Sequence, residues 1–301
     1  MKAKVLVALC LCAALLAACG EEGGAGGSDG SGSNSGDSTA SDFQESFEGA
    51  KAYPVFISSE LVVGENRFLV GLLDDNDAPI GDPGISVSIA FYDLQGGEAR
   101  RTERSELDFI PIEPGSRGVY VTHPTFDRPG QWGAEVSIKG QGIDESLKGS
   151  FEVRESSTTP PLGGRAPSSD TPTSDDVSDL SEISSDPKPD PRFYEKSVAE
   201  AIDDGDPFVL AFATPKFCQT AACGPALDVV KGVSKDYPKV TFIHVEPYKN
   251  LNDIGNVVPS VQEWGLPSEP YIFAVDSKGK VRAKFEGIVG ADELRSSLDS
   301  L

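Results

Sequence analysis

The chain has 301 residues and a formal net charge of −22 at pH 7, with 48 acidic residues against 26 basic ones. Because the phosphates of nucleic acids and of anionic lipid headgroups both require basic partners, this charge argues strongly against nucleic-acid binding and against adhesion to membranes through a basic surface. The length is sufficient for two ordinary domains joined by linkers.

Residues 1–18 have the three parts of an export signal. Lys2 and Lys4 precede an apolar run that is too short to span a bilayer comfortably, and small residues follow it. The segment Leu16-Ala-Ala-Cys19 resembles the lipobox of bacterial lipoproteins. This resemblance implies removal of a signal peptide, lipidation of Cys19 by palmitate or a similar acyl group, and anchoring on the extracytoplasmic face of the bacterial cell membrane. An ordinary secretory signal with an incidental cysteine is the alternative.

Two stretches have the composition of disordered polypeptide. Residues 19–50 are mostly Gly, Ser, Asp and Glu, with almost nothing to bury, and are predicted to form a disordered tether. Residues 156–191 are rich in Ser, Thr, Pro and Asp and are predicted to form a disordered linker. Such a linker would let the regions on either side of it move independently.

Residues 51–155 contain short runs of alternating apolar and polar residues, separated by turn residues and without a convincing helix. Several period-two strands at this spacing predict an all-β sandwich. The segments Gly118-Val-Tyr120 and Gly130-Gln-Trp132 resemble the closing hairpin of small immunoglobulin-like domains in bacterial exported proteins. We expect Tyr120 and Trp132 to pack in the core and His123 to be solvated. None of these residues indicates catalysis.

Residues 192–301 alternate between helical and strand patterns. This order predicts an α/β domain with a central sheet. The expected elements are a helix at 193–202, strands at 207–213 and 240–245, a helix from the cysteines to about 237, a hairpin formed by 271–275 and 280–285, and a closing helix at 291–301.

The same region resembles the thioredoxin family at two short motifs. Cys223-Gly-Pro225 matches the start of the family's Cys-Gly-Pro-Cys motif and follows an apolar strand that ends near Phe212. Gly265-Leu-Pro-Ser-Glu-Pro270 matches a glycine followed by the cis-proline that opens the next strand. The resemblance implies a thioredoxin-like fold over residues 192–301, a cis peptide bond before Pro270, and redox chemistry at Cys218 and Cys223.

Three residues depart from that family's pattern. Ala226 stands where the family has its second cysteine, Ala211 stands where it has a buried acid, and Phe217 stands where it has a tryptophan. The second thiol here is Cys218, upstream of the motif, and the larger loop can still close if the two Cα atoms lie within about 7 Å. The resemblance therefore lacks the general base that the family usually provides.

Thiol–disulfide exchange through Cys218 and Cys223 is the function that these residues favour, with an exported thiol or disulfide protein as partner and with no cofactor or metal. Cys223 is the better candidate for the lower pKa, because Gly-Pro follows it at a helix start, although the opposite assignment stays open. One alternative is an inactive binding module with a structural disulfide. A less favoured alternative is a Sco-like copper protein, in which His244 would be a ligand. Alternation places His244 on the same side of its strand as Phe242, which favours a structural histidine.

Overall fold

A computed structural model of the chain describes residues 38–44, 47–112, 117–218 and 222–301. The expected signal peptide at residues 1–18 and the expected lipidation site at Cys19 lie outside these ranges. Residues 37–301 cluster into one compact unit. Within the described ranges, no helix is both long and apolar enough to cross a membrane.

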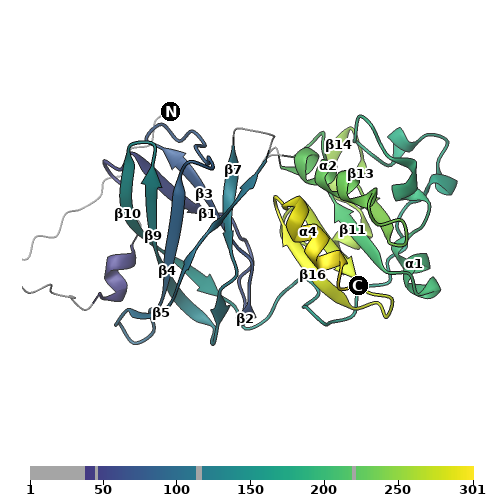
Figure 1. The fold of residues 1–301 in the computed structure, drawn as a ribbon. Helices are drawn as coiled ribbons and strands as arrows, with labels where there is room; N and C mark the ends of the chain where they lie inside the picture. The colour runs from purple at the N-terminus through teal and green to yellow at the C-terminus, as the bar shows by residue number, and fades with distance from the viewer. Residues whose placement is uncertain (1–37, 45–46, 113–116, 219–221) are drawn as a thin grey trace, which may run out of the picture. The chain divides into compact units, whose positions relative to one another are not determined.

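The chain is rich in β-structure, and its first half forms a sandwich of two antiparallel sheets of the immunoglobulin-like type (Figure 1). One sheet has the strand order β1-β3-β7-β6 and the other has the order β10-β9-β4-β5. A two-stranded ladder of β2 and β8 accompanies them. The strands are β1 (Ala52–Phe56), β2 (Gly64–Glu65), β3 (Phe68–Asp74), β4 (Ser86–Asp93), β5 (Arg100–Glu106), β6 (Asp108–Pro111), β7 (Gly118–Thr122), β8 (Thr125–Phe126), β9 (Gly130–Gly140) and β10 (Ile143–Val153).

The core of the sandwich is aromatic, and both sheets contribute to it. Phe68 of one sheet packs edge-on against Phe91 of the other, with ring centroids 5.1 Å apart. Tyr120 and Trp132 are each 1% exposed, and their polar atoms are satisfied by the carbonyl oxygens of Asp82 and Arg128. The predicted core positions are therefore confirmed, and His123 is exposed as expected.

The second half of the chain contains a mixed four-stranded sheet with the order β12-β11-β15-β16. β11 pairs in parallel with β12 and antiparallel with β15, and β16 continues the antiparallel part. The elements are α1 (Val198–Asp204), β11 (Phe208–Phe212), α2 (Cys223–Ser234), β12 (Thr241–Val245), the hairpin β13 (Tyr248–Asn250) and β14 (Asp253–Val257), α3 (Pro259–Glu263), β15 (Tyr271–Val275), β16 (Val281–Glu286) and α4 (Ala291–Leu298).

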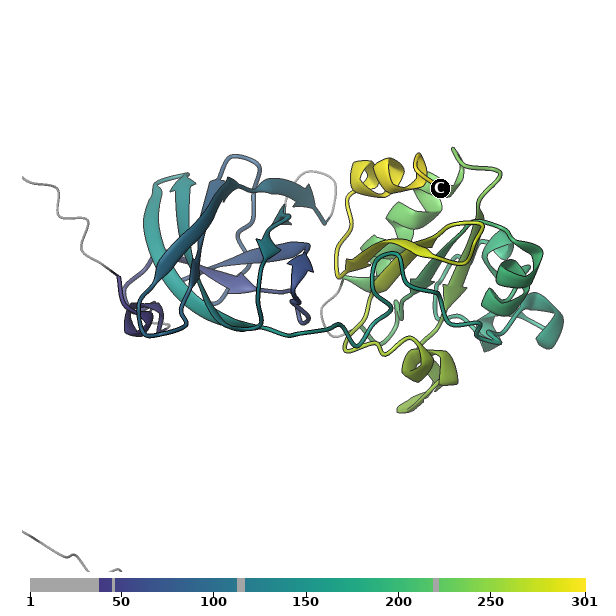
Figure 2. The same cartoon turned by 90° about the horizontal axis from the view of Figure 1, so that it is seen from below.

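Alternation along β11 divides the core of this region into two layers. Val209 and Ala211 pack with α2 and α4 on one face of the sheet, whereas Phe208 and Leu210 pack with α1 and Trp264 on the other. In Figure 2, the yellow helix α4 lies over one side of this sheet. The first helix begins at Val198 rather than at residue 193, because Ser197 forms a capping box with Glu200.

The expected tether 19–50 contains an ordered end. Residues 40–43 form the 3₁₀ turn η1 (Ala40–Phe43), and Phe43 is fully buried against Tyr92 with ring centroids 4.8 Å apart. Two phenylalanines, Phe43 and Phe47, give little sequence signal in a polar stretch, yet the burial of Phe43 fixes residues next to it on the sandwich.

Residues 156–191, expected to be a disordered linker, are packed onto the second half of the chain. They form the 3₁₀ turns η2 (Ser174–Asp176), η3 (Leu180–Glu182) and η4 (Pro191–Tyr194). Their buried hydroxyl groups hydrogen-bond to the neighbouring region: Ser169 accepts from the indole N–H of Trp264 at 3.1 Å, and Thr171 accepts from the backbone N–H of Val198 at 3.0 Å. The disordered-linker prediction is corrected because these hydroxyl groups satisfy buried donors instead of facing water.

The sandwich and the second half of the chain are joined by buried polar contacts. The guanidinium of Arg67 donates to both carboxylate oxygens of Glu293, at 2.9 and 3.0 Å, and to the carbonyl oxygens of Glu286 and Ile288. Its side chain is only 9% exposed. Independent movement of the two regions, which the linker prediction implied, does not agree with this contact.

Candidate functional site

The two body cysteines are disulfide-bonded between the end of β11 and the start of α2. Their Cα atoms are 5.9 Å apart, within the range that a disulfide requires. The carbonyl oxygen of Thr214 accepts from the backbone N–H groups of Phe217 and Cys218, at 3.2 and 3.0 Å, and this turn brings Cys218 back toward the helix. Sequence reasoning had selected this pair, and the structure brings the two residues together.

The two cysteine residues differ in exposure. Cys223 is fully buried in the core between the sheet and α2, whereas Cys218 is partly exposed. The backbone N–H of Cys223, the first residue of α2, donates to the Sγ atom of Cys218 at 3.2 Å. The N–H group at this helix terminus therefore favours negative charge on Cys218.

Pro270 opens β15, and the Glu269–Pro270 peptide bond is cis. The register that pairs Phe212 with Tyr271 places Pro270 beside the end of β11, from which the cysteine turn departs. The carboxylate of Glu269 accepts a hydrogen bond from the hydroxyl of Tyr248 at 3.2 Å. The ring of Tyr248 also contacts Phe217 edge-on, so the β13–β14 hairpin packs against the residue before Cys218.

Two alanines occupy the positions at which the thioredoxin motif has a buried acid and a second cysteine. Ala211 and Ala226 are each 1% exposed and lie in the same core cluster as Cys223. Neither side chain can take or give a proton, so any acid near the disulfide must come from another position.

A buried acid does lie nearby, at a position that sequence reasoning missed. Glu246 follows β12 and is 4% exposed, and its Oε2 accepts the backbone N–H of Ser185 at 2.9 Å. Burial raises the pKa of this carboxyl group, and the nearby hydroxyl of Thr214 opposes that shift. The available signal was a single acidic residue directly after an apolar strand, which has no characteristic spacing.

His244 is buried, and both of its ring nitrogens are engaged. Nε2 donates to the carbonyl oxygen of Ala213 at 2.9 Å, and because a carbonyl can only accept, Nδ1 is the acceptor for the hydroxyl of Tyr194 at 2.6 Å. Neither nitrogen is available to a metal ion. Among the described residues, no group of three His, Cys, Asp or Glu side chains could hold one.

The sandwich contacts the residue that precedes Cys223. Ala222 is 8% exposed and belongs to a hydrophobic cluster with Ile110, Val119 and Val121 of the sandwich and with Ile288. Strands β6 and β7 therefore cover Ala222, and the buried Arg67 contact fixes the sandwich to the same half of the chain.

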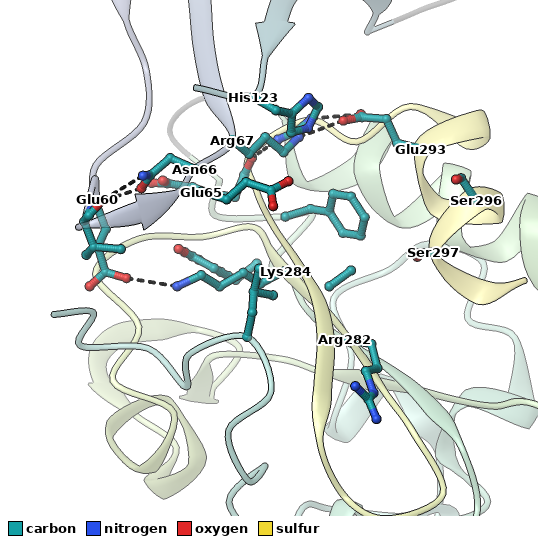
Figure 3. Close-up of a pocket in the computed structure, with 16 residues that line it drawn as sticks. Glu60, Glu65, Asn66, Arg67, His123, Arg282, Lys284, Glu293, Ser296 and Ser297 are labelled. Carbon is teal, nitrogen blue, oxygen red and sulfur yellow. Dashed lines mark hydrogen bonds and ion pairs between the residues drawn. The ribbon is translucent and has the colours of Figure 1, made fainter. Parts of the chain in front are cut away.

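A cavity of about 410 Å³ lies beside the contacts of Arg67 and Lys284, as Figure 3 shows. Two ion pairs lie among its lining residues: Arg67 pairs with Glu293, and Lys284 pairs with Glu60 at 3.5 Å. Neither cysteine lines it. A second cavity, of about 520 Å³, lies along the first turns of α2, with Gly224, Leu227 and Pro215 among its lining residues. This second cavity borders the cysteine turn.

Comparison with known proteins gives limited similarity. No family model and no curated protein matches the chain. Among solved structures, it is similar to a DUF4426 family protein from Pseudomonas aeruginosa PAO1, with 12% identity, coverage of 31% of this chain and 77% of that one, and a TM-score of 0.23. It is also similar to a putative superoxide reductase from Thermotoga maritima, with 18% identity, coverage of 39% and 98%, and a TM-score of 0.25.

A third similar structure is the CARDB domain of a Pyrococcus furiosus protein in complex with di-metal ions, with 13% identity, coverage of 35% and 90%, and a TM-score of 0.17. These three proteins are rich in β-structure, and none has the thioredoxin fold. Since no family model matches the chain, the assignment of residues 192–301 to the thioredoxin family, which had rested on two short motifs, is corrected. The identities and scores are too low to carry any inference about activity.

Proposed function

We propose that this protein carries out thiol–disulfide exchange. Cys218 is the cysteine that reacts with external thiols and disulfides, and Cys223 is its buried partner. The proposal is carried by one observation: Sγ of Cys218, a partly exposed residue, accepts the N–H of Cys223 at the start of α2. A thiolate at this position would be stabilised by the helix terminus, and thiolates are the reactive form in exchange.

The reaction that this geometry supports is reversible. An external thiolate attacks Sγ of Cys218, the intramolecular disulfide breaks, and Cys223 receives its electron pair. In the opposite direction Cys218 attacks an external disulfide, and Cys223 then resolves the mixed disulfide. The expected partner is an exported thiol or disulfide protein.

Single-cysteine variants test the proposed roles. Cys223→Ser should retain an accessible thiol and form a stable mixed disulfide with a small disulfide reagent. Cys218→Ser should leave only the buried thiol and react at least about tenfold more slowly, because reactivity follows thiolate character and access. Equal trapping by the two variants would reject the assignment of Cys218.

A permanent structural disulfide is the second candidate, and the complete burial of Cys223 favours it. The reduction potential separates the two functions. A value near about −120 mV would indicate an oxidant, one near about −270 mV a reductant, and one well below about −300 mV a structural bond. Failure of native protein to yield free thiols in the presence of reductant would reject exchange.

We also propose that lipidated Cys19 anchors the protein on the extracytoplasmic face of the bacterial cell membrane. The support is the lipobox-like segment ending at Cys19 and the compatibility of a disulfide with an oxidising compartment. Incorporation of labelled palmitate should be lost in Cys19→Ala, and this variant should move from the membrane fraction to the soluble fraction. A variant that keeps both label and membrane association would contradict the anchor.

A further inference from the structure

Glu246 is a buried carboxyl group whose polar atoms are only partly satisfied. Its Oε2 accepts from the N–H of Ser185, whereas its Oε1 has no hydrogen-bond partner within the described part of the chain. Leaving a buried acceptor without a partner is costly, so such a group requires an explanation. One explanation is a role in which the group is paired only during part of a reaction.

Thr214 connects this carboxyl group with the cysteine turn. Its side chain is fully buried, and its hydroxyl lies close enough to Glu246 to oppose the effect of burial on the pKa of that carboxyl group, although neither this hydroxyl nor Oε1 of Glu246 forms a hydrogen bond of good geometry within the described residues. Its carbonyl oxygen holds the N–H of Cys218 at 3.0 Å. The neighbouring residues of the two strands are in direct contact, because the N–H of Ala213 donates to the carbonyl of Val245 at 3.2 Å. Two unsatisfied polar side chains therefore lie together at the base of the turn.

Exchange at the disulfide requires a proton donor near Cys223. When the bond between the cysteines breaks, Cys223 leaves as a thiolate in a site where it is fully buried. An ionised group without a partner is strongly disfavoured in such surroundings, so a proton donor would assist the departure. Ala211 and Ala226 cannot supply one.

We propose that Glu246, acting through Thr214, is the proton reservoir for the buried thiol of Cys223; this inference rests on the exchange function proposed above. The incoming thiolate bonds to Sγ of Cys218 as the old disulfide breaks, and the electron pair of that bond goes to Cys223. The carboxyl proton of Glu246 passes to Cys223, which leaves a carboxylate and a neutral thiol. A second external thiolate then attacks the external sulfur, forms an external disulfide, and releases Cys218 as a thiolate.

Other titratable groups face Glu246 from several elements. Glu269 lies before β15, and its negative charge adds to the effect of burial in raising the pKa of Glu246. The negative charge of Glu246 contributes to raising the pKa of Tyr194 in η4 and of Tyr248 in β13. His244 lies two residues before Glu246, in β12. Burial keeps His244 neutral above about pH 4, and burial raises the pKa of both tyrosines, so none of these three titrates between pH 5 and 8.

The test is the pH dependence of disulfide reduction in the full chain by a small thiol, with the rate constant expressed per thiolate. In the wild type this constant should fall as pH rises through the pKa of Glu246, because the ionised carboxylate has no proton to give. Glu246→Gln should be slower at low pH, on the order of a hundredfold, and should show no such fall. Glu182→Gln removes an exposed acid that lines the same cavity as Glu246 and should behave like the wild type.

A second variant and a second readout separate proton transfer from mere structural support. Thr214→Val preserves shape but removes the hydroxyl, and it should weaken the same pH dependence. In the reduced protein, thiolate absorbance should titrate in two coupled steps in the wild type and in one step in Glu246→Gln. An unchanged pH profile in a folded Glu246→Gln variant overturns this inference while leaving exchange intact. A wild-type disulfide that small thiols cannot reduce overturns both proposals.

Discussion

Arg67 of the sandwich forms a two-pronged ion pair with Glu293 in the first turn of α4. The Nε and Nη2 atoms donate to the two carboxylate oxygens at 2.9 and 3.0 Å, and the side chains are 9% and 19% exposed. Two further donors reach the carbonyl oxygens of Glu286 and Ile288. This arrangement uses the fixed fork of the guanidinium, which a lysine cannot reproduce.

Replacement of Arg67 should therefore destabilise the whole compact unit. Arg67→Ala removes one partner of a buried pair and takes the guanidinium donors from two carbonyl oxygens and from Glu293, which keeps only the N–H of Gly290, so the free energy of unfolding should fall by about 3–5 kcal/mol. Arg67→Lys should recover only part of this loss. Arg101→Ala, at an exposed position of β5, should change it by less than about 0.5 kcal/mol. Denaturant titration measures all three, and equal effects of Arg67→Ala and Arg101→Ala would contradict a buried interface.

Reduction of the disulfide should cost stability without unfolding the chain. Cys218 and Cys223 are separated by five positions, and closing so short a loop stabilises a protein by about 2 kcal/mol in the chain-entropy account. The free energy of unfolding should fall by that amount when reductant is added. The double variant Cys218→Ser and Cys223→Ser should show no response to reductant. A response in that variant would mean that the reductant acts elsewhere.

Glu60 should make stability depend on pH in the acidic range. Burial by itself would raise the pKa of this carboxyl group, but hydrogen bonds from residues 157–159 outweigh burial and lower the pKa to about 2. Because the folded-state pKa lies below the unfolded one, the stabilisation is fully present above about pH 4.5 and is lost as pH falls toward 2.

The contribution of Glu60 to the free energy of unfolding follows from the difference between its folded and unfolded pKa values and is about 3 kcal/mol. Glu60→Gln should lower stability at pH 7 and flatten the dependence between pH 4.5 and 2. Glu195→Gln, an exposed acid, is the matched control and should leave both unchanged. Parallel curves for the wild type and Glu60→Gln over this range would show that Glu60 does not carry the dependence.

The sandwich was predictable because its signal is local and repeated. Alternation along each strand determines which residues face the core, and Tyr120 and Trp132 are bulky enough to be placed there with no knowledge of the tertiary fold. The cysteine pair was equally visible, since only two cysteines lie beyond residue 19. The thioredoxin-family assignment was wrong because motifs of three to six residues occur without the family.

The contacts between regions could not be read from the sequence. Ser and Thr in residues 156–191 have the composition of a disordered segment, yet Thr159 and Ser169 are each 1% exposed and hydrogen-bond to Glu60 and Trp264. Arg67 precedes an apolar strand and reads as a solvated residue. In each case the partner lies about a hundred residues or more away in the chain, and only the folded structure brings it close.

His244 provides the sharpest test of the buried polar network beside β12. Burial lowers the pKa of its imidazole to about 4, from a usual value near 6.5, although the carbonyl of Ala213 opposes this shift. The folded state therefore binds fewer protons than the unfolded state between these values, and stability should fall as pH decreases from 6.5 to 4. Nuclear magnetic resonance of the ring protons should show no titration between pH 5 and 8. A midpoint near 6.5 for His244 would show that the pairing with Tyr194 and Ala213 does not hold the ring neutral in solution.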